Sequence, residues 1–270
     1  MQAVQPILLD RDKLPIINAI SEIREKAVLF RDSVKKFGDF NIAACANVAS
    51  KEPMVDEVGK ILATDVFKWS DDDDSWWRRP EIALSSPIPR ACRYEGEAFW
   101  CNADGFYPRL PNVLLDEIDL TKFSNHVRPR ALICVPVHMP FGQIGAVSFS
   151  TADLTKEDLT DEFKAFGNAM EILSRAFISS YVKVTDQRNW IPADCSLSKR
   201  EVQCVSWAAL GKTDREIATI LSRSCATVRF HLQNAARKLD AVNRSQTVFK
   251  ASQLGYLGSV AVTNGMSHAS

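Results

Sequence analysis

One stretch of the chain, residues 198–254, restricts the possible folds more than any other part of the sequence. It contains two S/T-x-x-E segments, which begin at Ser198 and Thr213 and end at Glu201 and Glu216. This pattern is typical of a capping box, because the hydroxyl and the carboxylate each accept a hydrogen bond from an N–H group that the start of a helix leaves free. Each segment therefore predicts the start of a helix.

Two further helix starts have weaker capping residues. Ser224 is a good N-cap but is followed three residues later by threonine, and Asn243 with Gln246 forms a passable cap. Gly211 stands where the first helix must end, since glycine adopts a left-handed conformation at little cost. The stretch thus predicts four short helices, with a tight turn at 222–224 between the second and the third. The residues of the third helix that we expect to face the core are Val228, Leu232, Ala235 and Leu239.

Charge is distributed unevenly along the chain, although the formal net charge is zero. Residues 193–258 hold ten basic and five acidic residues, a net charge of +5, and residues 1–192 hold 23 basic and 28 acidic residues, a net charge of −5. This asymmetry favours a basic module that binds a polyanion, attached to an acidic partner domain.

The second and third predicted helices are consistent with a helix-turn-helix, which places the N-terminal half of its second helix in the major groove of DNA. Arginine on that helix suits phosphate or guanine. An ordinary helical bundle also has polar outer faces, so the DNA-binding interpretation depends on the combination of helix caps, tight turn and basic charge. His231 is as compatible with a packing role as with a role in DNA binding. The predicted DNA-binding residues are Thr227, Arg229, Phe230, Gln233 and Arg237.

The N-terminal part of the chain predicts a mixed α and β domain. Some segments repeat apolar residues every three or four positions, as amphipathic helices do, and others are short apolar runs typical of strands. The predicted helices are residues 14–37, 55–69 and 155–184. The predicted strands are residues 40–48, 131–137 and 143–150. The last two form a hairpin in which Gly142 and Gly145 give backbone freedom, and we expect an α+β sandwich with helices flanking an antiparallel sheet.

Residues 76–111 are unusually rich in proline and tryptophan, and the prolines predict that no regular helix forms there. Aromatic rings beside a few polar groups suit the wall of a small-molecule cavity. The alternative is a core that the tryptophans merely fill. The four aspartates at 71–74 are interpreted as a solvated loop, because successive residues do not converge on one metal ion without a shaped loop.

The C-terminal stretch resembles the DNA-binding domain of the LuxR family, from its LS-x-RE start through TV-x-FHL-x-N to KL and NR-x-Q. Glu201 and Gly211 occupy two of the family's signature positions, whereas Val205 replaces the usual leucine. The resemblance implies a tetrahelical helix-turn-helix that binds a two-fold-related DNA site as a homodimer. It also implies dimer contacts from the fourth helix, near residues 245–254.

The N-terminal part is similar to the autoinducer-binding domain of quorum-sensing regulators, an αβα sandwich around an acyl-homoserine lactone. It lacks the acidic pair and the phosphoacceptor aspartate of a phosphoreceiver domain. The autoinducer family has a Trp and a Tyr four residues apart, an Asp-Pro pair nine residues after the Tyr, and a further Trp. Alignment on Ser86 and Pro87 places Asp73 at the first Trp and Trp77 at the Tyr, with Trp100 near the last Trp.

These departures change the expected ligand. The family's Asp accepts a hydrogen bond from the ligand amide, whereas Ser86 is only a weak acceptor at that position. The family's Trp donates a hydrogen bond to the lactone carbonyl, and an ionised Asp73 has no hydrogen to donate. A ligand group buried without a partner costs about 1 to 3 kcal/mol. We therefore predict a small, largely apolar effector other than a standard acyl-homoserine lactone. The predicted ligand-binding residues are Trp77, Ser86, Arg93, Tyr94, Trp100 and Ser148.

Other functional classes have little support in the sequence. The four histidines are dispersed and no nucleophile and base stand in a recognisable arrangement, so we predict no enzyme, no metal site and no cofactor apart from the effector. Seven cysteines without a C-x-x-C pair predict neither a zinc ribbon nor a disulfide framework, which fits a cytoplasmic protein. No apolar run approaches the ~18 residues of a membrane span.

The sequence as a whole predicts a ligand-responsive transcription factor. One alternative is a constitutive DNA-binding regulator whose N-terminal domain only dimerises or docks a protein, and a remote one is an enzyme that uses the N-terminal cavity. The predicted domain organisation is residues 1–183 for ligand binding and dimerisation, 184–195 as a linker, 196–258 for DNA binding and 259–270 as a flexible tail.

Overall fold

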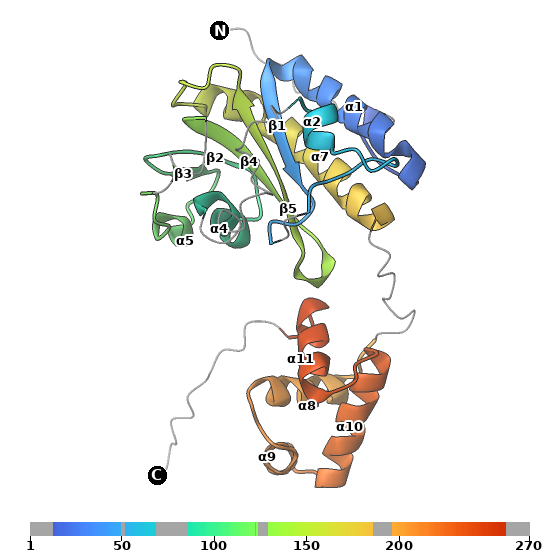
Figure 1. Cartoon of the computed structure of the whole chain (residues 1–270). Helices are drawn as coiled ribbons and strands as arrows, with labels where there is room; N and C mark the ends of the chain where they lie inside the picture. The colour runs from blue at the N-terminus through green and yellow to red at the C-terminus, as the bar shows by residue number, and fades with distance from the viewer. Residues whose placement is uncertain are drawn as a thin grey trace. The chain divides into compact units, whose positions relative to one another are not determined.

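The computed structural model describes most of the chain as two compact units, one N-terminal and one C-terminal (Figure 1). The described residues are 13–49, 52–68, 86–121, 123, 129–185 and 196–257. The aspartate run and Trp77 lie outside them.

The N-terminal unit is built on a five-stranded antiparallel sheet with the strand order β1-β5-β4-β2-β3. The two predicted hairpin strands are confirmed as central members of this sheet. Between them, Pro140–Gly142 forms a single 3-10 turn (η5), and Gly142 has a φ of 71°. The strands are β1 (Phe40–Cys45), β2 (Phe99–Asn102), β3 (Phe106–Pro108), β4 (Ala131–His138) and β5 (Ile144–Thr151).

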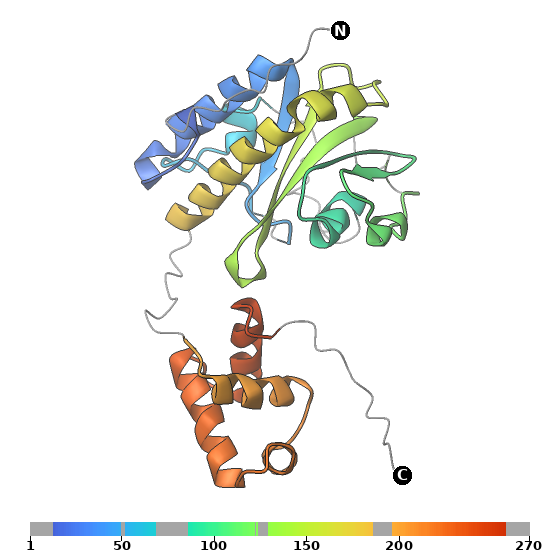
Figure 2. The same cartoon turned by 180° about the vertical axis from the view of Figure 1, so that it is seen from behind.

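One face of the sheet is closed by helices α1 (Ile23–Val34) and α7 (Thr160–Thr185); in Figure 2, α7 runs across the sheet and α1 lies beside it at the β1 edge. Their apolar stripes meet the sheet in an aromatic core, where the rings of Phe30 and Phe177 stack with centroids 4.9 Å apart and Phe149 packs beside Phe30. Burial of such large rings on both helices fixes this layer of the sandwich.

Both helices begin later than predicted. Single 3-10 turns, η2 (Ile20–Glu22) and η3 (Lys35–Phe37), flank α1, and residues 14–19 are not helical. Helix α7 begins at Thr160 rather than at residue 155, and just before it Asp158 accepts a hydrogen bond from the Thr160 N–H at 2.7 Å, as aspartate does in turns. The helix includes Val184 and Thr185, which the domain prediction places in the linker.

The helix predicted at 55–69 is wrong for most of the described part of that segment. Only α2 (Leu62–Asp65) is helical. The preceding residues form a tight turn around Asp56, whose carboxylate accepts hydrogen bonds from the N–H groups of Val58 and Lys60. Gly59 in this turn has a φ of 81°, which glycine adopts at little cost. Local hydrogen bonds to aspartate have therefore replaced the helical ones.

The opposite face of the sheet carries α4 (Pro87–Tyr94) and the single turn α5 (Val113–Asp116), seen towards the viewer in Figure 1. Helix α4 contradicts the expectation that the prolines exclude a helix here. Pro87 and Pro89 occupy its first turn, where the backbone N–H groups have no partner within the helix and proline costs little.

The C-terminal unit consists of the four predicted helices, and their predicted caps are confirmed. Ser198 and Thr213 form complete capping boxes with Glu201 and Glu216. Ser224 accepts a hydrogen bond from the Thr227 N–H at 3.0 Å and caps α10. The helices are α8 (Lys199–Ala209), α9 (Asp214–Ile220), α10 (Cys225–Lys238) and α11 (Arg244–Gln253).

The turns and the core of this unit also agree with the predictions from the sequence. Gly211 has a φ of 78° after the first helix, and Ser222 in the turn before α10 has a φ of 51°. The inward row of α10 is confirmed, because Val228, Ala235 and Leu239 are almost completely buried and Leu232 packs against both core clusters of the unit.

Candidate DNA-binding surface and ligand-binding face

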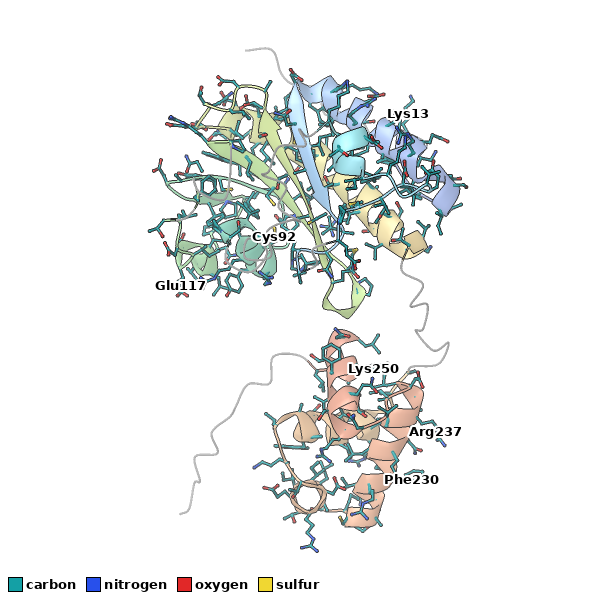
Figure 3. The ribbon with its side chains drawn as sticks, in the orientation of Figure 1. Lys13, Cys92, Glu117, Phe230, Arg237 and Lys250 are labelled. Atoms are coloured by element: carbon teal, nitrogen blue, oxygen red, sulfur yellow. The ribbon has the colours of Figure 1, made fainter. Side chains whose placement is uncertain are left out.

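Helix α10 presents the predicted DNA-binding residues on its outer surface. Arg229, Phe230, Gln233 and Arg237 are exposed, and Figure 3 shows Phe230 and Arg237 projecting from the helix. Thr227 is only half-exposed, and its hydroxyl lies 2.8 Å from the capping hydroxyl of Ser224. The structure therefore brings four of the five residues to one accessible helix surface, while the fifth takes part in the N-cap.

Two of the arginines have partners within the domain. Arg237 donates a hydrogen bond from Nη2 to Asn234 Oδ1 at 2.8 Å, on the same helix. Arg229 Nε lies 3.5 Å from Asp214 Oδ2 at the start of α9. Since both guanidinium groups remain exposed, either can exchange its partner for an acceptor on DNA.

Phe230 is the largest apolar side chain on this surface and is 59% exposed. Its ring lies 5.7 Å from the half-buried ring of His231 in an edge-on arrangement. Thus His231 helps to support the phenylalanine, as a packing residue does, and the phenylalanine presents an apolar face to solvent.

A partly buried ion pair joins α10 to α8. Lys238 Nζ donates to Glu201 Oε2 at 2.9 Å, and the same oxygen accepts the Ser198 N–H at 2.7 Å. Burial alone raises the pKa of Glu201, but the hydrogen bonds from Ser198 and Lys238 together outweigh burial, so this pKa lies below its ordinary value.

The predicted ligand-binding residues of the N-terminal unit do not form one group. Trp100 pairs with Ile133 across β2 and β4, so its side chain faces the aromatic core on the α1 and α7 side, where it stacks on Tyr107 at 4.0 Å. Ser148 pairs with Cys134 across β5 and β4 and faces the α4 side. The two residues therefore point to opposite faces of the sheet.

Three other predicted residues lie on or beside α4. Ser86 is buried at the N-cap of α4, but its hydroxyl makes no capping hydrogen bond. Arg93 donates from Nη1 to the carbonyl oxygen of Pro89 within the same helix, and Tyr94 is 42% exposed at the helix end. The structure thus places Ser86 and Ser148 on the α4 side of the sheet, whereas Arg93 makes its hydrogen bond within α4.

Sequence reasoning missed the cysteines on this side of the sheet. The thiols of Cys92 on α4 and Cys134 on β4 are both fully buried and lie 3.5 Å apart (Cys92 is labelled in Figure 3). Cys101 belongs to the same cluster, and Cys45 packs against it. Successive side chains of a strand point to opposite faces of the sheet, so the predicted strand at 131–137 could have placed Cys134 on the face opposite Ile133. Nothing in the sequence indicated that α4 would pack against that face.

Small uncharged side chains dominate the strands of this face. Where β1, β5 and β4 lie side by side, the residues directed to it are Ala43, Cys45, Cys134, Pro136, Ala146 and Ser148. The hydroxyl of Ser148 donates to Cys134 Sγ at 3.7 Å. Hydrogen bonding to Cys134 and burial raise the pKa of Cys92 well above its ordinary value, which keeps that thiol neutral. This part of the face therefore offers weak polar groups and no charge.

The described parts of the chain show neither a membrane-spanning helix nor a metal site. No helix there is long and apolar enough to cross a membrane. No cluster of three or more His, Cys, Asp and Glu side chains within the described ranges is placed to hold a metal ion.

Four capped helices in this order, with the helix after the tight turn exposed, define a helix-turn-helix DNA-binding domain. Residues 195–251, which make up most of this domain, match the family of bacterial regulatory proteins, luxR family.

Curated relatives of the chain are regulators of transcription, not enzymes. The transcriptional activator protein VanR of Vibrio anguillarum is 35% identical over 128 residues, which are 47% of this chain and 52% of VanR. The quorum sensing-dependent regulator RpaR of Rhodopseudomonas palustris is 37% identical over 124 residues, 46% of this chain and 47% of RpaR. The chain thus spans about half the length of the curated relatives that it matches.

Solved structures of the Escherichia coli protein SdiA are also similar to this chain. One crystal structure has 20% sequence identity and a TM-score of 0.47, over 90% of this chain and 93% of SdiA. A structure of SdiA in complex with octanoyl-rac-glycerol has 20% identity and a TM-score of 0.46, over 90% of this chain and 91% of SdiA.

Proposed function

We propose that this chain is a ligand-responsive transcription factor that binds two-fold-related double-stranded DNA as a homodimer. The observation that carries the proposal is the outer surface of α10, where Arg229, Phe230 and Gln233 are exposed together. Arginine matches the acceptors of guanine, glutamine those of adenine, and an apolar ring suits the methyl group of thymine.

The proposed homodimer is supported by the outer surface of α11. Phe249 on this helix is 58% exposed, within the segment that the LuxR resemblance assigns to dimer contacts, and Val242 just before the helix is 85% exposed. Replacement of Phe249 by aspartate should shift sedimentation from dimer towards monomer. Matched substitution of Ile220, another exposed apolar residue in the same unit, should leave the sedimentation coefficient unchanged.

The proposed effector is a small, largely apolar molecule held on the α4 side of the sheet. The small neutral side chains there, with the hydroxyl of Ser148 as a polar group, suit such a ligand better than a charged one, because an unpaired charge is costly to bury. We retain Ser86 and Ser148 as proposed contacts on this face, and Trp77 as a prediction outside the described residues. Trp100 belongs to the core on the opposite face.

A thermal-shift screen of the full chain tests the effector proposal. The compounds would be acyl-homoserine lactones of several lengths, octanoyl-rac-glycerol and unrelated apolar metabolites. We expect a rise in the melting temperature with an apolar compound that is not a lactone. The variant Ser148→Leu should abolish the rise, and Ser179→Leu, which changes another half-buried serine of the same unit, should keep it.

The same screen distinguishes the proposal from its rivals. A large shift from lactones alone would contradict the non-lactone effector. No shift from any compound, together with sequence-selective DNA binding by protein free of small molecules, would favour a constitutive regulator.

A further inference from the structure

One carboxylate at the start of α9 joins the helices that surround the candidate DNA-binding surface. Asp214 is the first residue of α9, and its two oxygens accept hydrogen bonds from two different helices. Oδ1 accepts from Nη1 of Arg244, the first residue of α11, at 2.7 Å, and Oδ2 lies 3.5 Å from Nε of Arg229 on α10.

The two arginines are held to different degrees. Arg244 also donates from Nη2 to the carbonyl oxygen of Lys212 at 2.5 Å, so its guanidinium group has two fixed acceptors just before and at the start of α9. Arg229 has the longer contact and a side chain that is 63% exposed, against 23% for Asp214. Arg244 therefore anchors the carboxylate, and the carboxylate holds Arg229 weakly.

This asymmetry matters because Arg229 is one of the residues directed towards DNA. A free arginine on a DNA-facing helix contacts phosphates of any sequence, which raises non-specific affinity. A carboxylate beside the guanidinium group repels phosphates and restricts the Arg229 side chain to one orientation. A guanine edge, which offers two acceptors to arginine, is the kind of group that can replace this carboxylate.

We propose that Asp214 is a positioning residue for DNA recognition, which orients Arg229 and makes its contact with the operator more selective for one base pair. The proposal rests on the proposed function of the chain as a DNA-binding regulator. Arg244 acts one step further away, because it fixes the carboxylate that orients Arg229.

The experiment uses the full-length chain and a binding site that wild-type protein selects from a random double-stranded DNA pool. Affinity is then measured at one salt concentration for this site, for every single base-pair substitution in it, and for unrelated DNA. Asp214→Asn should reduce discrimination at one position of each half-site by about 5- to 20-fold, within the range that one bidentate contact contributes. Its affinity for unrelated DNA should rise about 2- to 5-fold.

Asp240→Asn is the matched control. It removes the same charge from the same domain at an exposed residue after α10, and asparagine tolerates the positive φ of 47° found there. This variant should tighten binding to all sequences alike and keep the discrimination of wild type. Equal discrimination by the two variants would overturn the proposal.

A double-mutant cycle tests whether Asp214 acts through Arg229. In the background Arg229→Ala, the change Asp214→Asn should no longer alter discrimination at the affected position, and additive effects of the two changes would overturn the proposal. Arg244→Lys keeps the charge but loses the two-point contact, so it should weaken discrimination at the same position. This variant carries the test if circular dichroism shows that Asp214→Asn does not fold.

Failure of the inference and failure of the proposed function give different results. If wild-type protein selects no sequence from the pool, the proposed function fails and this inference fails with it. If wild type selects a site and Asp214→Asn discriminates as well as wild type does, only the positioning role fails.

Discussion

Lys238 Nζ lies 2.9 Å from Glu201 Oε2, and this contact joins the C-terminal end of α10 to the first turn of α8. The glutamate is also half of a capping box, so one side chain both starts α8 and contacts α10. Its side chain is only 6% exposed, and loss of its charge would leave Lys238 without its carboxylate partner.

We therefore predict that Glu201→Gln destabilises the C-terminal unit by about 1.5 to 3 kcal/mol, the usual contribution of a hydrogen bond to a charged group. Amide hydrogen exchange of the α8 and α10 peptides is the appropriate measurement, because it reports on this unit alone. Glu216→Gln changes the same atoms in the exposed capping box of α9 and should cause a smaller loss of protection. Equal losses in the two variants would mean that the contact with Lys238 contributes nothing.

The same carboxylate predicts a dependence of stability on pH. The pKa of Glu201 is lower in the folded protein than in the unfolded chain, where it is about 4.3. Its contribution is thus fully present above that value and is lost as the pH falls through the lower, folded pKa. The difference in protection between wild type and Glu201→Gln should be constant from pH 7 to pH 6 and should shrink below about pH 4.

Glycine is required at position 145 on β5, but the reason differs from the one that the sequence suggests. The hairpin pattern predicts that this glycine gives backbone freedom, but its φ is not in the left-handed region, unlike that of Gly142. A Cβ atom at Gly145 would lie 2.6 Å from Ile178 Cγ2 on α7 and 3.0 Å from the carbonyl oxygen of Cys45. The glycine is there because helix and strand approach closely, which only the tertiary structure reveals.

We accordingly predict that Gly145→Ala lowers the stability of the N-terminal unit by about 1 to 3 kcal/mol through overpacking. Gly96→Ala is the control, since a Cβ atom there meets nothing within 4 Å. The melting temperature, together with amide hydrogen exchange of the β4 and β5 peptides, measures the effect of each substitution. An unchanged melting temperature for Gly145→Ala would show that Ile178 moves aside at no cost.

Agreement between sequence and structure depends on how local the determining interactions are. The caps at Ser198 and Thr213 involve residues three positions apart, so the four C-terminal helices and the outer surface of α10 follow from the sequence. The wrong helix at 55–69 came from apolar spacing that ignored the hydrogen bonds accepted by Asp56. Short elements were harder, because the four residues of β2 are all buried and show no alternation.

The candidate ligand site was predicted less well for the same reason. The faces of Trp100 and Ser148 depend on the register of β2, β4 and β5, which pairs residues more than ten positions apart. Until β2 was known to be a strand, nothing in the sequence could place its tryptophan on the side opposite Ser148. The thiol pair of Cys92 and Cys134 joins segments 42 residues apart and left no pattern in the sequence.

Arg237 provides a prediction for the candidate DNA-binding surface. It is exposed on α10 and its only described hydrogen bond runs to Asn234 on the same helix. If it neutralises one phosphate, Arg237→Ala should weaken binding equally at all sequences and reduce the slope of log affinity against log salt by about 0.9. Arg130→Ala removes an exposed arginine of the N-terminal unit and should leave the slope unchanged. An unaltered slope for Arg237→Ala would remove this residue from the DNA contact.

The buried thiols of the N-terminal unit should be protected from alkylation. Hydrogen bonding to Cys134 and burial keep the pKa of Cys92 well above its ordinary value, and burial does the same for Cys101, so few thiolates form at neutral pH. Because the reactive species is the thiolate and iodoacetamide must also reach it, we expect Cys92 and Cys101 to react at least about tenfold more slowly than the half-exposed Cys225 of α10. Peptide mass spectrometry after timed labelling measures all three rates in one sample, and denaturant should make them similar. Rapid labelling of Cys92 in the native protein would show that α4 separates readily from β4, and the α4 side of the sheet would then be open to solvent rather than a closed apolar face.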